Sequence, residues 1–276
     1  MIRIKKKIKV NAAIVGFQKC GTSALHQFLS FHPDIIVSDP KETHFFSTSK
    51  NYSKGISHYH SYFKVSFFER VKGKIFLDAS PSYSSVLYQD FAISKMYSYN
   101  PSFKIICMVR NPIHRAYSAW NMYRKRFKQN QRWFQELEER MHGKSSKMIA
   151  RTVEELDNFD LYVERELEAF ANNMNIEAVI LPQGLYSIGI RNIKMHFQNC
   201  LFIDNEDMQQ NTPEYLHMVS NFLGVKKINW NDFEGMKFFN QDYKRAISSK
   251  TNSVLETYYK DSDRELEELT GISYFS

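Results

Sequence analysis

Residues 10–31 read VNAAIVGFQKCGTSALHQFLSF and contain three structural signals in succession. The apolar segment Val10–Val15 predicts a short buried strand, and Thr22–Phe31 carries apolar residues at helical spacing behind a Thr or Ser that can cap a helix. Between them lie Gly16 and Gly21, in a chain with only ten glycines. Strand, glycine loop and helix in this order open many nucleotide-binding α/β units.

The same alternation continues downstream. Further strands are predicted at Ile35–Val37, Ile75–Leu77, Lys104–Val109, Ala178–Leu181 and Leu201–Ile203, with helices at about 112–126, 133–173 and 187–197. Strands that alternate with helices indicate an α/β fold with a central, mainly parallel sheet flanked by helices. Since no Pro/Gly/Ser linker divides the chain, we expect a single domain over residues 10–276, preceded by a basic arm at residues 1–9.

Most of the net positive charge lies in the first nine residues. The 37 Lys and Arg against 30 Asp and Glu give +7, but five basic residues lie in the first nine positions. The remaining 267 residues therefore carry +2, which disfavours a nucleic-acid binding face. The more economical reading of the arm is a solvated segment.

Cysteine spacing and hydropathy exclude several classes of protein. The three cysteines show no CxxC or Cys/His ligand spacing, so we expect neither a disulfide framework nor a metal site. The longest apolar run, Ile105–Val109, is far below the roughly 20 residues of a spanning helix. The first residues show no apolar core of a signal peptide, so we expect none. We expect a cytoplasmic protein, with a trimmed Golgi-lumenal domain as the alternative.

The loop Gly16–Ser23 (GFQKCGTS) has the GxxxxG spacing of a P-loop. In such a loop, backbone N–H groups and the N-terminus of the following helix bind a phosphate or sulfate. The loop departs from the NTPase form because Thr22 replaces the lysine expected after the second glycine, and Lys19 lies three positions earlier. The plain alternative is a tight turn between strand and helix.

Four blocks resemble the PAPS-dependent sulfotransferases, most closely the heparan sulfate N- and 3-O-sulfotransferases. They are GFQKCGTSAL at 16–25, KETHFFS at 41–47, DASPSY at 78–83, and VRNP at 109–112 with Arg115 and Ser118 beyond it. A weaker match continues through Gly184–Tyr186, residues 203–208 and residues 222–225. The resemblance implies a P-loop-like sulfotransferase fold that moves a sulfuryl group from PAPS (3′-phosphoadenosine 5′-phosphosulfate) to a hydroxyl. The product would be 3′-phosphoadenosine 5′-phosphate (PAP), and no metal would be required.

The resemblance also assigns donor-binding residues. The 5′-phosphosulfate would be bound by the loop residues Lys19, Cys20, Gly21, Thr22, Ser23 and Ala24. Lys19 would also act in catalysis, because its ammonium can stabilise the negative charge that develops on the bridging oxygen. Arg110 and Ser118 would bind the 3′-phosphate, which suits a forked guanidinium. Arg115 is a weaker candidate, because arginines on such a helix are often surface residues. Lys244 and Arg245 match a basic lid only loosely, and a solvated charge pair is the alternative.

The general base follows from the KETHFFS block. By resemblance Glu42 takes the acceptor proton, and His44 is its rival or its assistant. Lys41 would bind an anionic group of the acceptor or tune Glu42. Lys41, His44, Ser80 and Tyr83 are the expected acceptor-side residues, while Phe45 and Phe46 are expected in the core.

Two departures concern the acceptor. Ala79 and Ser47 replace a lysine and an acid of the 3-O-sulfotransferases, so heparan sulfate itself is not the expected acceptor; another saccharide or glycoconjugate hydroxyl is. The alternatives are a lipid or small-molecule hydroxyl, a P-loop kinase or NTPase with Ile75–Asp78 as a Walker B-like strand, and a non-catalytic module that binds membranes or acidic polymers through residues 1–9. The sequence does not specify an oligomeric state.

Overall fold

Five short parallel strands form one sheet in the computed structural model. They are β1 (Ala12–Ile14), β2 (Ile35–Val37), β3 (Ile75–Ala79), β4 (Lys104–Val109) and β5 (Cys200–Asp204), in the spatial order β2-β3-β1-β4-β5. Every neighbouring pair is parallel, and the central β1 pairs Ile14 with Ala79 of β3 and Ile106 of β4. β1, β3 and most of β4 are buried because both faces of a parallel sheet are covered. The expected fold class is confirmed.

The structure describes residues 8–65, 73–85, 89–142, 148–239 and 246–275. The chain divides into two compact units, one of Met1–Val109 with Gly189–Gln241 and the other of Arg110–Ile188 with Asp242–Ser276. The sheet lies in the first unit. Most of the basic arm lies outside the described residues, so the expected boundary between the arm and a domain at residues 10–276 stays a prediction.

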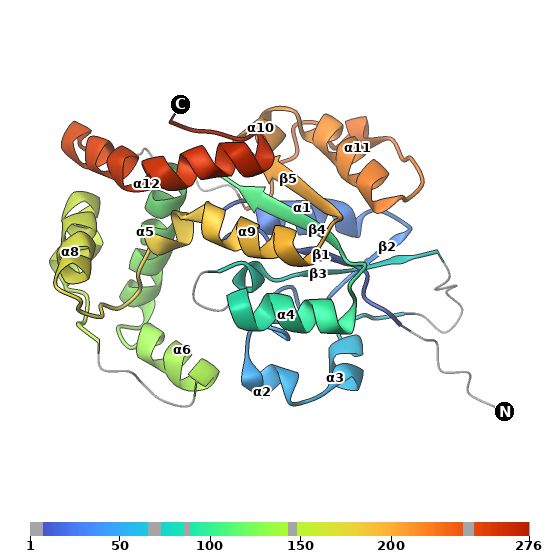
Figure 1. The fold of residues 1–276 in the computed structure, drawn as a ribbon, viewed down its shortest axis with the longest axis horizontal. Coiled ribbons are helices and arrows are strands. Elements are labelled where there is room, and N and C mark those ends of the chain that lie inside the picture. Colours follow the sequence, from blue (N-terminus) through green and yellow to red (C-terminus); the bar gives the residue numbers. More distant parts are fainter. Residues whose placement is uncertain (1–7, 66–72, 86–88, 143–147, 240–245, 276) are drawn as a thin grey trace. The chain divides into compact units, whose positions relative to one another are not determined.

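Helices cover the sheet of the first unit on both faces. α1 (Thr22–Ser30) leads to β2 on one side of β1, while α4 (Gln89–Tyr99) leads from β3 to β4 on the other side. Because crossovers between parallel strands are right-handed, these opposite directions put the two helices on opposite faces. Figure 1 shows α4 in front of the sheet and α1 behind it.

Further helices and two 3₁₀ turns complete the first unit. They are α2 (Ser49–Tyr52), α3 (Ile56–His60), η1 (Pro81–Tyr83), most of α9 (Tyr186–His196), α10 (Asn205–Gln210), α11 (Thr212–Leu223) and η3 (Trp230–Phe233). The 3₁₀ turn η1 directly follows β3, and α10 directly follows β5. Both elements therefore begin at the carboxyl end of a strand, which is the edge where α/β folds bind ligands.

The second unit is helical. It contains α5 (Pro112–Gln129), α6 (Trp133–His142), α7 (Val153–Asp157), α8 (Phe159–Ala171), η2 (Pro182–Gly184) and α12 (Ser249–Thr270). Aromatic residues dominate its core, among them Tyr117, Trp120, Phe159, Tyr162 and Tyr259. The helical pattern expected over 133–173 corresponds to three helices, α6, α7 and α8, and Thr152 and Asn158 cap the starts of the last two with their side chains.

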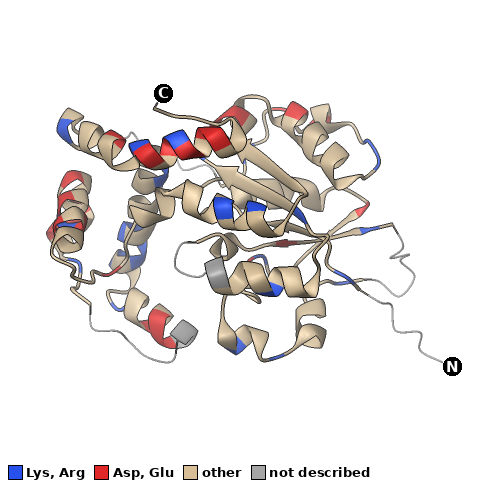
Figure 2. Ribbon diagram, in the orientation of Figure 1, with Lys and Arg blue, Asp and Glu red and all other residues tan. Residues whose placement is uncertain are grey.

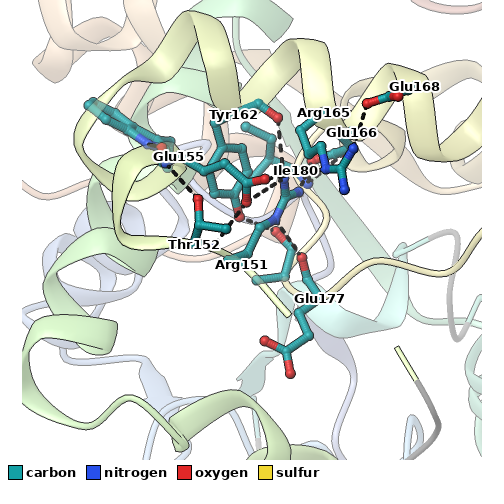
Figure 3. A network of polar contacts seen from close by, with 11 residues as sticks. Arg151, Thr152, Glu155, Tyr162, Arg165, Glu166, Glu168, Glu177 and Ile180 are labelled. Carbon is teal, nitrogen blue, oxygen red and sulfur yellow. Dashed lines mark hydrogen bonds and ion pairs between the residues drawn. The ribbon is translucent and has the colours of Figure 1, made fainter. Parts of the chain in front are cut away.

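The strand expected at Ala178–Leu181 is also wrong. The backbone N–H groups of Ile180 and Leu181 donate to the buried carboxylate of Glu166 on α8 instead of to a neighbouring strand. Glu166 also forms an ion pair with Arg151, Nη2 to Oε2 2.7 Å, and both side chains are fully buried (Figure 3). The N–H groups of this short apolar segment are therefore satisfied by a buried carboxylate rather than by a neighbouring strand.

Charged side chains of both signs mix along the helices. α12 carries both acidic and basic residues along its length, as Figure 2 shows. Such mixing is typical of a solvated helix surface. Among the described residues, no helix is both long enough and apolar enough to cross a membrane.

Candidate active site

The glycine loop lies between β1 and α1, and close packing explains both of its glycines. A Cβ at Gly16 would lie 2.1 Å from the backbone nitrogen of Met108 on β4, which cannot give way. Gly21 has a φ of 83°, and a Cβ there would lie 1.8 Å from Oδ1 of Asn205. The loop is therefore pressed against the neighbouring strand and the start of α10, where only glycine fits.

No side chain among the described residues caps the first turn of α1. The sequence predicts Thr22 or Ser23 as the helix cap, but the cap is Gly21, which has no side chain to bond the helix N–H groups. A helix N-terminus that its own cap leaves open can donate N–H groups to a phosphate or sulfate. Thr22 is buried and Ser23 half-buried here, so backbone donors carry most of this capacity.

Backbone conformation singles out the residues that were assigned to catalysis. Lys19, Glu42 and His44 have φ values of 68°, 64° and 49°, and they are three of the six non-glycine residues with positive φ in the described chain. Such a conformation costs roughly 1–3 kcal/mol per residue and is concentrated at functional sites. The coincidence supports these three positions as a site on physical grounds that are independent of the motif.

Glu42 is placed by the end of β3 and by two basic neighbours. Its backbone N–H donates to the carbonyl of Ala79, which ties the loop to the sheet edge. Lys41 Nζ lies 2.6 Å from Glu42 Oε1, and His44 Nε2 lies 3.6 Å from Glu42 Oε2. The Glu42 side chain remains 42% exposed, so an acceptor can reach it.

His44 faces two hydroxyls on its other side. Its Nδ1 lies 2.8 Å from Ser82 Oγ, and Ser82 Oγ lies 2.8 Å from Ser47 Oγ. Burial lowers the pKa of His44 below its usual value, and the carboxylates of Glu42 and Asp78 only partly oppose this. The imidazole is therefore neutral at neutral pH.

A buried carboxylate lies beneath this loop. Asp78 on β3 is fully buried and accepts hydrogen bonds from Thr43, Tyr59, Ser80 and Tyr83 at 2.7–3.0 Å. Burial raises the pKa of Asp78, and these four hydroxyl donors oppose the shift. Because its oxygens are occupied by protein hydroxyls, Asp78 does not suit the Walker B role of binding a magnesium ion.

The Asp78 network changes how two expected acceptor residues are understood. Ser80 and Tyr83 have no exposed surface, and both donate their hydroxyls to Asp78. Through Asp78 they support the Glu42 loop, which comprises residues 41–47. Neither side chain reaches the solvent, where an acceptor would bind. Phe45 and Phe46 are fully buried core residues, as expected, and Phe45 stacks on Tyr59 at 4.5 Å between ring centroids.

α1 begins at the glycine loop, and its residue His26 lies near the Glu42 loop. His26 lies one turn into this helix, and its Nε2 contacts the Ser38 carbonyl at 3.4 Å. Burial, and next the charge of Lys41, lower the pKa of His26 to about 4, while Glu42 and Asp39 oppose the shift. The helix that begins at the glycine loop therefore also lies within electrostatic reach of Lys41 and Glu42.

The residues expected to bind the 3′-phosphate belong to the second unit. Arg110 directly follows β4 and precedes α5, whose N-terminus Asn111 caps through its side chain. The hydroxyl of Tyr186 donates to the Arg110 carbonyl at 2.8 Å, and Ser118 is a mostly buried residue two turns into α5. Arg115 was expected at the surface, which is wrong, since it is fully buried and donates to the Ile180 carbonyl.

The Arg151 network supports the segment that carries Tyr186. Arg151 donates to the carbonyls of Glu177 and Tyr162 as well as to Glu166, and its guanidinium lies 3.6 Å from the Tyr162 ring centroid (Figure 3). Tyr259 donates to the Leu181 carbonyl from α12. These contacts order the chain just before η2 and Tyr186.

Some expectations lie outside the described residues or were missed. Lys244 and Arg245 are outside the described residues, so their lid role stays a prediction. Sequence reasoning assigned no role to Ser82, Tyr59, Tyr186 or Asn205. Ser82, Tyr186 and Asn205 lie inside quoted motif blocks, which was an available signal, whereas nothing in the sequence marks Tyr59.

Comparisons with known proteins identify a family for the chain. A family model described as the sulfotransferase domain matches residues 10–260. Heparan sulfate glucosamine 3-O-sulfotransferase 5 of Mus musculus is 32% identical over 109 residues, 40% of this chain and 29% of that protein. Bifunctional heparan sulfate N-deacetylase/N-sulfotransferase 2 of Homo sapiens is 26% identical over 233 residues, 77% of this chain and 22% of that protein. The chain thus spans less than a third of either relative.

A solved structure supports the fold. The sulfotransferase from Alicyclobacillus acidocaldarius aligns with a TM-score of 0.67 at 23% sequence identity, over 97% of this chain and 98% of that one. At this identity the likeness concerns the fold alone.

Proposed function

Because the chain belongs to the sulfotransferase domain family, we propose that it transfers a sulfuryl group from PAPS to a hydroxyl of a carbohydrate acceptor. The observation that carries the proposal is the Glu42 loop, in which an exposed carboxylate is held between Lys41 and His44 at the edge of the sheet. Ligands of α/β folds bind at this edge. The glycine loop follows β1 at the same edge and supplies backbone donors for an anion.

The proposed reaction is an in-line displacement at sulfur. The acceptor oxygen forms a bond to the sulfur while the bond from sulfur to the 5′-phosphate oxygen breaks. Glu42 accepts the hydroxyl proton, and the leaving group is PAP. The ammonium of Lys19 would stabilise the charge that develops on the leaving oxygen, since a fixed charge acts most strongly where charge appears in the transition state.

A metal ion has no evident role in this scheme. The sulfuryl group carries less charge than a γ-phosphoryl group, so less neutralisation is needed. The acid expected to bind magnesium in an NTPase, Asp78, instead accepts four protein hydroxyls. This occupation favours the sulfotransferase proposal over a P-loop kinase or NTPase.

The acceptor class rests on the named relatives, which act on heparan sulfate. Ser47 in the Glu42 loop and Ala79, whose carbonyl accepts from the Glu42 N–H, both depart from the 3-O-sulfotransferase pattern. We therefore propose a saccharide or glycoconjugate other than heparan sulfate, with a lipid or small-molecule hydroxyl as the second candidate. A cytoplasmic location stays a prediction.

Nucleotide titration tests the donor assignment. We expect calorimetry to detect PAP binding without added magnesium, and much weaker binding of Mg-ATP, which lacks a 3′-phosphate. Tight Mg-ATP binding without PAP binding would contradict the proposal. Transfer of label from ³⁵S-PAPS to a panel of saccharides, lipids and phenols then identifies the acceptor.

Arg110→Ala is expected to weaken PAP binding about 10- to 100-fold, because hydrogen bonds to a charged group contribute roughly 1.5–3 kcal/mol. The loss should be much smaller for adenosine 5′-phosphosulfate, which has no 3′-phosphate. Arg264→Ala, an exposed arginine of the same unit, serves as the control and should bind PAP normally. Unchanged PAP affinity in Arg110→Ala would remove Arg110 from the donor site.

Tyr186→Phe tests whether the position of Arg110 matters. The change deletes only the hydroxyl that donates to the Arg110 carbonyl, a hydrogen bond that contributes about 1 kcal/mol. We expect the KM for PAPS to rise about fivefold while kcat changes by less than twofold. A fall in kcat with an unchanged KM would show that Tyr186 acts elsewhere.

A further inference from the structure

Four polar side chains form a row that ends at Glu42. They are Ser47, Ser82, His44 and Glu42 itself. Ser47 Oγ contacts Ser82 Oγ at 2.8 Å, Ser82 Oγ contacts His44 Nδ1 at 2.8 Å, and His44 Nε2 faces Glu42 Oε2 at 3.6 Å. Ser47 is buried and Ser82 half-buried. The row therefore joins two segments, the loop at residues 41–47 and the turn η1, at one imidazole.

The row restricts which nitrogen of His44 carries the proton. A neutral imidazole has one N–H donor and one bare nitrogen, and its hydrogen-bond partners choose between them. A proton on Nδ1 would leave the lone pair of Nε2 facing a carboxylate oxygen of Glu42, which is repulsive. A proton on Nε2 points an N–H at Glu42, and Nδ1 then accepts from the Ser82 hydroxyl.

We propose that Ser82, supported by Ser47, holds His44 as its Nε2–H tautomer, which makes His44 a positioning residue that orients Glu42. The proposal rests on the proposed function, in which Glu42 is the base. It also separates two roles that the motif alone left open, because an imidazole whose Nε2–H faces Glu42 at 3.6 Å is not the group that accepts the acceptor proton.

Neighbouring contacts hold this arrangement in place. The backbone N–H of His44 contacts Ser80 Oγ at 3.3 Å, and His44 has a positive φ of 49°, so its position depends on the surrounding structure. Lys41 contacts the other carboxylate oxygen, Oε1, at 2.6 Å. Each carboxylate oxygen of Glu42 therefore lies next to a different basic side chain, Oε1 next to Lys41 and Oε2 next to His44.

The charged groups around His44 agree with a neutral ring. Glu42 and Lys41 face it from its own loop, and Asp78 faces it from β3. Burial outweighs the two carboxylates and lowers the pKa of His44, while Lys41 acts in the same direction. A neutral ring is the form in which a choice of tautomer exists.

Nitrogen NMR of the full chain tests the tautomer directly. In ¹⁵N-histidine-labelled protein, long-range proton–nitrogen spectra distinguish Nε2–H from Nδ1–H imidazoles, and His44→Gln identifies the His44 signals by their loss. We expect the Nε2–H pattern in the wild type and a shift towards mixed tautomers in Ser82→Ala. Ser53→Ala removes a hydroxyl that bonds only its own helix carbonyl at Lys50, so it should match the wild type.

An Nδ1–H or doubly protonated His44 in the wild type at neutral pH would overturn the proposal, and so would a tautomer unchanged in Ser82→Ala. The wild-type spectrum tests the tautomer of His44 even if Ser82→Ala does not fold. The spectrum also does not depend on turnover, so failure of the proposed function, seen as absent PAP binding, is distinguishable from failure of this inference.

Kinetics of two His44 variants separate positioning from proton transfer. A glutamine amide can place an N–H near the position of Nε2, whereas alanine cannot. We expect His44→Gln to keep kcat within about tenfold of the wild type and His44→Ala to lose about 100-fold, with the KM for PAPS unchanged in both. If His44 were the base, both variants would lose activity equally, because neither amide nor methyl accepts the proton.

Discussion

Glu42→Gln is expected to lower kcat about a thousandfold while PAP affinity stays within about twofold of the wild type. A positioned general base contributes roughly 10²–10⁴ to a rate, and the amide keeps the shape of the carboxylate but cannot take a proton. Lys41 and His44 lie against this side chain, so the isosteric change disturbs packing less than truncation to alanine. Single-turnover rates with ³⁵S-PAPS and calorimetry with PAP measure the two quantities.

Glu214→Gln is the matched control, since Glu214 is an exposed glutamate on α11 of the same unit, and it should turn over at the wild-type rate. Wild-type turnover in Glu42→Gln would remove Glu42 as the base. If Glu42→Gln lost both its activity and its affinity for PAP, the substitution would have disrupted the loop, and thermal unfolding would reveal this.

Lys19→Ala is expected to reduce kcat about 100- to 1000-fold, the typical effect of removing one group that stabilises transition-state charge. The reduction should fall mainly on kcat, because the charge on the leaving oxygen increases as the bond to sulfur breaks. PAPS turnover under saturating donor measures it, and Lys194→Ala, on α9, is the control lysine.

Backbone strain at Lys19 allows a second comparison. Its φ of 68° is costly for alanine but not for glycine. Lys19→Gly should therefore be as inactive as Lys19→Ala but unfold at a higher temperature. If Lys19→Gly retained activity, the loop's conformation rather than the ammonium would be the essential feature.

Local patterns predicted the core of the fold. β1, the glycine loop, α1 and β4 formed where expected, because a strand buried on both faces is apolar throughout and glycines mark the intervening turn. The patterns failed in the second unit. An apolar run at residues 178–181 looks the same whether a strand or a buried carboxylate receives its N–H groups, and Glu166 receives them here.

Motif resemblance predicted several of the site residues but not how they are arranged. Ser80 and Tyr83 were expected on the acceptor side and instead donate to Asp78. That outcome depends on Asp78 being fully buried, and Thr43, Tyr59, Ser80 and Tyr83 converge on it from three different segments. No spacing in the sequence reports such convergence.

The segment at residues 10–31 specifies its strand, loop and helix because hydrophobic periodicity and glycine act over neighbouring residues. The tertiary structure decided which side chains surround Glu42. Ser82 lies 38 positions from His44 and Tyr59 lies 19 from Asp78, so only the pairing of β1, β2 and β3 brings them within hydrogen-bonding distance. Burial then decides the protonation of His44, because desolvation depends on everything packed around the ring and not on the residues beside it in the chain.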